Sequence, residues 1–116
     1  MSLKLSKITF FVNDMDKATK YYSETLKLTA YDIRPGWSGY KVSKDLVIAF
    51  HKGSKRHPRL TFTTYKNIEQ VREELNKRGA KLAPVKDFGD GLLICKGRDP
   101  DGLMIEIANK VASRKK

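Results

Sequence analysis

The sequence contains one structural pattern twice, and this internal repeat limits the folds open to a chain of 116 residues. In each half, a β-branched and aromatic run precedes a segment with helical spacing, and three short strand-like runs follow. The first half covers residues 5–51 and the second covers residues 59–109, with a basic linker at 52–58 and a basic tail at 110–116. We therefore expect a single α+β domain over residues 1–116 that is built from two βαβββ modules.

Capping and turn residues mark the ends of the expected elements. Asn13 and Asp14 precede the first helical segment, and Asn67 with Gln70 resembles a capping box before the second. Gly79 stands where the second helix would end. The buried face of the first helix is expected to carry Met15, Ala18, Tyr22 and Leu26. The expected strands are residues 7–12, 29–34, 37–42 and 46–51 in the first half, and 59–64, 81–88, 92–96 and 103–109 in the second.

One helix per module can cover only one face of a four-stranded sheet. The other face needs cover from the partner module, from a second chain or from a ligand. We therefore expect a curved mixed sheet around a cleft, with the helices on the outside.

The last expected strand carries Glu106 alone among large apolar residues, after the turn formed by residues 99–102. Strand alternation predicts a core face and a second face; the core face has Leu103, Ile105 and Ile107, and the second has Met104, Glu106 and Ala108. A buried carboxylate requires a cation, a proton or a metal ion.

Composition narrows the class of partner. The net charge is +11, from 24 Lys and Arg against 13 Asp and Glu, which attracts anions or forms an ordinary solvated surface. The basic clusters are not interleaved with aromatic residues, so a nucleic-acid partner is not expected. No apolar stretch reaches the ~20 residues of a membrane span. Cys95 is the single cysteine and the first residues lack a signal-peptide pattern, which predicts a cytoplasmic protein.

Two segments resemble a known family. Val12-Asn13-Asp14-Met15, which leads into Tyr21-Tyr22, is one of them, and residues 99–107 are the other. They resemble the vicinal oxygen chelate superfamily, which includes glyoxalase I, bleomycin-resistance proteins and extradiol dioxygenases. The resemblance covers residues 5–109 and implies paired modules around a site, where the metalloenzymes of the family hold a divalent metal.

The metal-ligand positions implied by this resemblance fall on Lys7, Ala49, Arg59 and Glu106. Lysine and arginine are cationic donors without a lone pair for a metal, and alanine has no ligand atom. One carboxylate does not make a metal site, so we expect neither a bound metal nor a cofactor.

The expected cleft residues are Lys7, Phe11, His51, Arg59 and Glu106. Lys7 and Arg59 either neutralise Glu106 or bind a carboxylate or phosphate of a ligand. Glu106 is either a member of this ion pair or a general base.

The remaining candidates each have a functional and a structural interpretation. Trp37 and Tyr40 either stack on a planar ligand or pack in the core or at a dimer interface. His51 and His57 are expected at the rim or the surface, and Cys95 is expected to be a buried thiol.

Two classes of function remain open from the sequence. The first is a metal-free protein that binds a small anionic or planar organic molecule in the cleft. The second is a lyase or dioxygenase-type enzyme that acts on a small oxygenated substrate, with Glu106 as base or metal ligand. In either class a homodimer is expected, because isologous dimers are the commonest oligomers.

Overall fold

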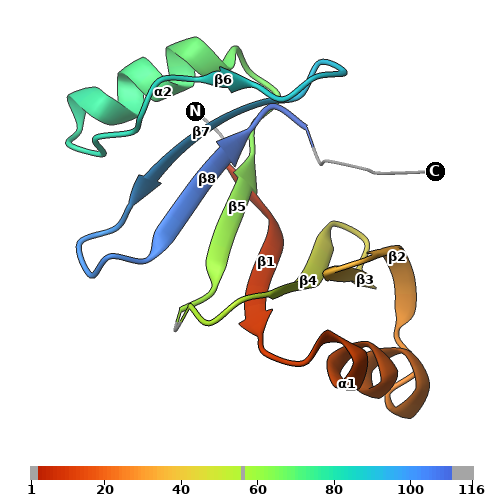
Figure 1. Cartoon of the computed structure of the whole chain (residues 1–116). Helices are drawn as coiled ribbons and strands as arrows, with labels where there is room; N and C mark the ends of the chain where they lie inside the picture. Colours follow the sequence, from red (N-terminus) through yellow and green to blue (C-terminus); the bar gives the residue numbers. More distant parts are fainter. Residues whose placement is uncertain (1–2, 56, 111–116) are drawn as a thin grey trace.

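The computed structural model of the chain describes residues 3–55 and 57–110 (Figure 1). The first module consists of β1 (Lys4–Val12), α1 (Met15–Lys20), η1 (Tyr21–Thr25), β2 (Thr29–Arg34), β3 (Trp37–Ser43) and β4 (Leu46–Lys52). The second consists of β5 (Arg59–Thr63), α2 (Ile68–Lys77), β6 (Lys86–Asp87), β7 (Leu93–Arg98) and β8 (Met104–Ala108). The repeated strand–helix–three-strand pattern is confirmed.

The strands form one mixed sheet of eight strands in the order β2-β3-β4-β1-β5-β8-β7-β6. β1 is parallel to β4, β5 is parallel to β8, and the two modules join through the antiparallel pair β1–β5. Figure 1 shows the sheet curving, with α1 beside the first module and α2 beside the second. The α+β prediction with a curved mixed sheet is therefore confirmed.

Both helices begin at the predicted caps. The Asp14 Oδ1 atom accepts a hydrogen bond from the Lys17 amide at 3.0 Å, and Asn67 Oδ1 accepts one from the Gln70 amide at 3.1 Å. Each bond satisfies an amide that has no partner within its helix. Past the end of α2, Gly79 has φ +100 and its amide donates to the Asn76 carbonyl, a glycine-terminated helix end.

The first helix is packed less tightly than its sequence predicts. After Lys20 it widens into the π-helical turn η1, where the Leu26 amide donates to the Tyr21 carbonyl. This widening rotates the following residues away from the face set by a period of 3.6. Tyr22 stacks on Phe50 with ring centroids 4.1 Å apart, but Leu26 is 47% exposed, so the prediction that Leu26 shares the buried face is wrong.

The strand expected at residues 81–88 is reduced to β6, so the prediction for 81–85 is also wrong. Side chains of α2 supply the hydrogen bonds that a neighbouring strand would have made. Asn76 bonds both the amide and the carbonyl of Leu82, and the Arg72 Nε atom donates to the Leu82 and Ala83 carbonyls. Lys81 also has a positive φ of 59, which is not an extended conformation.

The core lies between the helices and the outer face of the sheet. Under α2 the buried side chains are Ile68, Val71, Leu82, Cys95 and Ile107. Under α1, Tyr40 is fully buried and its hydroxyl pairs with the Ser23 hydroxyl at 2.8 Å. The other face of the sheet is concave, and it carries Glu106 as the alternation of β8 predicts.

Candidate functional site

Neighbouring strands place Glu106 in one row with Thr61 and Lys7 on the concave face. Lys96 of β7 pairs with Glu106 of β8, Glu106 pairs with Thr61 of β5, and Thr61 pairs with Lys7 of β1. Side chains of directly paired residues point to the same side of a sheet. This row therefore carries the central charges of the concave face.

Glu106 is held by neighbours on both of its carboxylate oxygens. The Thr61 hydroxyl donates to Oε1 at 2.9 Å, while Arg59 Nε and Lys96 Nζ lie 3.6 Å and 3.7 Å from Oε2. The Glu106 side chain is only 8% exposed. Lys7 and Arg59 were the predicted ion-pair partners of Glu106. In the structure Arg59 forms this pair, and Lys96 forms a second one that was not predicted. The two charge contacts are longer than hydrogen bonds, so they are ion pairs without hydrogen-bond geometry.

Lys7 is less exposed than Lys96, the other lysine of this row, and it has no ion-pair partner among the described residues. Among the described residues it makes no ion pair within 4.0 Å and no side-chain hydrogen bond. Its ammonium stands 5.2 Å from the centroid of the Trp37 ring. Burial lowers the pKa of Lys7; Glu106 and Asp32 oppose this shift, and Arg59 and Arg34 add to it.

These side chains line a cavity of about 250 Å³ on the concave face. Its charged walls contain four cations, Lys7, Arg34, Arg59 and Lys96, against two carboxylates, Asp32 and Glu106. Its other walls are Tyr31, Trp37, Val47, His51, Phe88, Leu92 and Ile94. Because Arg34 Nε pairs with Asp32 at 3.2 Å, the positive surplus falls on the side of Lys7 and Arg59. The cavity thus combines excess positive charge with flat apolar walls.

Three buried polar atoms on this face have no hydrogen-bond partner among the described residues: Thr9 Oγ1, Trp37 Nε1 and Arg59 Nε. Thr9 and Arg59 are directly paired across β1 and β5. The Trp37 Nε1 atom lies over Gly39, and Gly39 and Thr9 both pair with Ala49. Indole and guanidinium N–H groups can only donate, and neither of these two nitrogens has an acceptor within hydrogen-bond distance among the described residues.

The two aromatic candidates separate onto opposite faces of β3. Trp37 is 9% exposed, lines the cavity and has the Lys7 and Arg34 cations on its ring, each 5.2 Å from the centroid. Tyr40 instead packs under η1 and does not line this cavity. The aromatic wall therefore consists of Trp37 and Tyr31 in the first module and Phe88 in the second.

The remaining candidates lie at or beyond the rim. His51 lines the cavity but is exposed, and its Nδ1 lies 2.8 Å from the Lys52 carbonyl, so Nδ1 carries the donated proton. Phe11 does not line the cavity; its ring stands 5.7 Å from the Arg59 guanidinium. His57 is exposed outside the cavity. Cys95 is buried under α2, and burial raises the pKa of its thiol.

Three charged residues of the cavity did not follow from the sequence: Asp32, Arg34 and Lys96. Lys96 could have been found from the antiparallel pairing of the last two strands, because that pairing sets it opposite Glu106. Asp32 and Arg34 depend on a register irregularity in β2 between Ala30 and Asp32, which no sequence signal marks.

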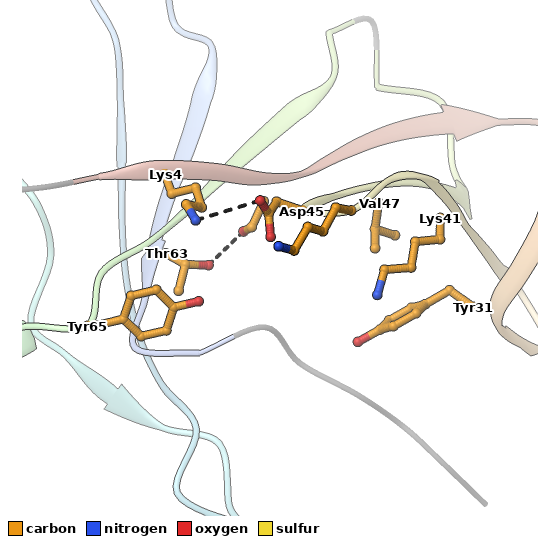
Figure 2. A pocket seen from close by; sticks show the side chains of 9 residues that line it. Lys4, Tyr31, Lys41, Asp45, Val47, Thr63 and Tyr65 are labelled. Atoms are coloured by element: carbon orange, nitrogen blue, oxygen red, sulfur yellow. Dashed lines mark hydrogen bonds and ion pairs between the residues drawn. The ribbon is translucent and has the colours of Figure 1, made fainter.

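A second, smaller cavity of about 110 Å³ lies on the same face and shares Tyr31 and Val47 with the first (Figure 2). It is lined by Lys4, Lys41 and Lys44 around Asp45, and Lys4 pairs with Asp45 at 3.7 Å. On the same wall, the Thr63 hydroxyl donates a hydrogen bond to the Ser6 hydroxyl at 2.7 Å. The Lys4 and Asp45 side chains are 52% and 55% exposed, so solvent weakens this charge cluster relative to the larger cavity.

The four positions that the family resemblance implies as metal-ligand positions are related by the symmetry of the two modules. Lys7 and Arg59 are equivalent in β1 and β5, and Ala49 and Glu106 are equivalent in β4 and β8, since they pair with Thr9 and Thr61. This set offers one carboxylate, and its other side chains are cations or a methyl group. No group of three or more His, Cys, Asp or Glu side chains in residues 3–55 and 57–110 could hold a metal ion. The residues present do not fit a divalent metal.

The sequence profile of the Glyoxalase/Bleomycin resistance protein/Dioxygenase superfamily matches residues 4–107. The chain belongs to this superfamily. Among curated proteins no sequence is significantly similar to it. Many solved structures of other proteins share the fold of this superfamily member.

Three of these structures illustrate the likeness. A superfamily member from Vibrio splendidus 12B01 is 11% identical, with a TM-score of 0.71 over 92% of this chain and 98% of that one. A hypothetical protein from Bacillus halodurans C-125 is 16% identical, with a TM-score of 0.71 over the full length of both. Homoprotocatechuate 2,3-dioxygenase from Arthrobacter globiformis is 12% identical, with a TM-score of 0.73 over 97% of this chain but 38% of that one. At these identities the likeness is one of fold. None of the helices described here is long and apolar enough to span a bilayer.

Proposed function

We propose that this superfamily member binds a small organic carboxylate with a flat apolar part, in the cavity between Lys7, Arg59 and Trp37, without a metal ion. The observation that carries the proposal is the shortage of acceptors in the cavity. Trp37 Nε1 and Arg59 Nε have N–H groups without an acceptor, and Lys7 has no counter-ion within 4.0 Å among the described residues. A buried cation without a counter-charge is costly, and a ligand carboxylate would supply that counter-charge to Lys7 while it accepts from the terminal nitrogens of Arg59.

Each wall of the cavity has a role in this proposal. Arg59 offers its terminal nitrogens to a carboxylate, and Lys7 adds a point charge beside it. Trp37 and Phe88 provide flat apolar surfaces for the rest of the ligand. His51 lies at the entrance, and Phe11 supports the guanidinium of Arg59.

Glu106 acts as a positioning residue in this proposal. Its carboxylate keeps Arg59 and Lys96 in place and limits the charge that these cations leave buried. The alternative, a lyase or dioxygenase-type enzyme with Glu106 as base or metal ligand, requires a free carboxylate oxygen. Both oxygens of Glu106 are engaged, by Thr61 on one side and by two cations on the other.

A ligand screen by thermal shift tests the proposal. Benzoate is expected to raise the melting temperature, while benzamide, its neutral counterpart, is not. The shift should disappear in Arg59→Ala and persist in Arg78→Ala, which removes an arginine that is 69% exposed and far from the cavity. A shift that appears only after Zn²⁺ or Ni²⁺ is added would support the enzyme alternative instead.

The homodimer stays a prediction, and light scattering during size-exclusion chromatography measures it directly. Apolar side chains exposed on the single chain include Phe10, Tyr21, Leu26 and Ile33, each at least 38% exposed. Side chains of this kind are common at protein interfaces.

A further inference from the structure

Anion binding alone does not explain the position of the Lys7 amine in the cavity. A lysine that binds anions at a protein surface is usually hydrated and free to move. Lys7 is instead part of the cavity floor, with its amine against the Trp37 ring. The other lysine of this cavity, Lys96, is 54% exposed and already paired with Glu106. Two amines therefore face the same space in very different surroundings.

Burial is the largest cause of the lowered pKa of Lys7, and the charged groups around this amine act in both directions. The groups that face it are Asp32 and Arg34 from β2, His51 from β4, Arg59 from β5, Lys96 from β7 and Glu106 from β8. Both carboxylates already have closer cationic partners than Lys7. Together with burial, this lowers the pKa of Lys7 below that of an ordinary lysine. A neutral amine is a nucleophile, whereas an ammonium is not.

We propose that Lys7 condenses with the carbonyl group of a 2-oxo acid whose carboxylate is bound by Arg59. The proposal rests on the proposed function, because it uses the same carboxylate site. The Lys7 nitrogen attacks the carbonyl carbon and forms a C–N bond. The carbonyl oxygen then leaves as water with the two hydrogens of the amine, and an imine remains. The reaction requires no oxidant, reductant or metal.

The spacing of the two residues suits this class of compound. Lys7 pairs with Thr61, and Arg59 pairs with Thr9, so Lys7 and Arg59 are diagonal neighbours across β1 and β5. Diagonal neighbours in an antiparallel pair lie about 7–8 Å apart, within reach of two long side chains that meet on one small molecule. A 2-oxo acid carries its carboxylate and carbonyl on adjacent carbons, so one end can bind Arg59 while the next carbon meets the amine.

Reductive trapping tests the inference on the full chain. The protein is treated with limiting glyoxylate and sodium cyanoborohydride near neutral pH, and peptides are mapped by mass spectrometry. The expected result is faster carboxymethylation of Lys7 than of any other lysine, because a lowered pKa leaves a larger share of this amine neutral. Excess benzoate should slow the reaction at Lys7 and leave the other lysines unchanged.

Variants separate this inference from the proposed function. Lys7→Arg keeps the charge but has no amine, so it should bind benzoate and lose the fast adduct. Lys77→Arg, at an exposed position of α2 outside the cavity, should keep both. Modification spread evenly over the lysines of the wild-type protein would overturn the covalent step even if benzoate binds. Failure of the wild-type protein to bind benzoate would overturn the carboxylate site itself. The peptide map of the wild-type protein alone shows whether Lys7 reacts faster than the other lysines. The covalent step can therefore be tested even if Lys7→Arg folds poorly.

Discussion

Lys7 of β1 and Arg59 of β5 occupy equivalent positions in the two modules, each directly before one member of the Ile8–Leu60 pair of the β1–β5 ladder. The same symmetry relates Ala49 to Glu106. In this superfamily member the four positions therefore contain two cations, one methyl group and one carboxylate. The fold that the chain shares with its relatives is retained, and the proposed anionic ligand follows from the two cations at these positions.

Replacing Arg59 by alanine should weaken benzoate binding about 10- to 100-fold. A hydrogen bond to a charged group is worth about 1.5–3 kcal/mol, which corresponds to that range of affinity. Isothermal titration calorimetry measures the change, and Arg78→Ala on the exposed face of α2 is the matched control. Equal affinity in wild type and Arg59→Ala would place the carboxylate elsewhere.

Glu106→Gln should destabilise the fold but leave benzoate binding intact or tighter. The substitution removes the counter-charge of Arg59 and Lys96, which should lower the free energy of unfolding by about 1–3 kcal/mol. It also removes a negative charge near the bound carboxylate. Urea unfolding and calorimetry on the same variant measure the two effects. Loss of binding without loss of stability would show that Glu106 contacts the ligand itself.

Lys7→Met should stabilise the protein near pH 7, and this advantage should shrink as the pH rises. The pKa of Lys7 is lower in the folded chain than the ordinary value of 10.5, so the unfolded chain binds more protons between the two values. Over that interval the wild-type protein therefore gains stability with rising pH, while the methionine variant lacks this term. Urea unfolding from neutral to alkaline pH gives the difference between the two proteins, and a constant difference would contradict a lowered pKa.

Trp37→Leu should reduce selectivity for flat ligands more than it reduces overall affinity. Benzoate and cyclohexanecarboxylate have the same charge and similar size, but only benzoate has an aromatic face. Aromatic pairs contribute about 0.5–1.5 kcal/mol beyond burial, so the preference for benzoate should fall about two- to tenfold. Competition titrations of the two acids against wild type and variant measure this ratio. An unchanged ratio would mean that the Trp37 ring does not contact the ligand.

Much of the fold followed from local signals in the sequence. The caps at Asp14 and Asn67 and the turn at Gly102 act through hydrogen bonds and dihedral angles of a few neighbouring residues, so local sequence is sufficient to predict them. Alternation along β8 likewise placed Glu106 on the face opposite the core residue Ile107. These features need no knowledge of the distant chain.

Most features that the sequence did not predict depend on contacts between separate elements, and one depends on a local change in helix geometry. Residues 81–85 are not a strand because Asn76 and Arg72 of α2 take their hydrogen bonds. Leu26 is exposed because the helix widens after Lys20. Lys96 belongs to the site because β7 pairs with β8. Tyr40 lies outside the site because β3 directs its side chain toward η1.

The proposed function depends on a carboxylate that binds between Lys7 and Arg59 without a metal ion. The most direct measurement is a calorimetric titration of chelator-treated wild-type protein with benzoate and, separately, with benzamide. We expect one benzoate per chain, unchanged affinity after chelation, and no measurable binding of benzamide. Equal binding of both compounds, or benzoate binding that returns only when a divalent metal ion is added, would contradict it.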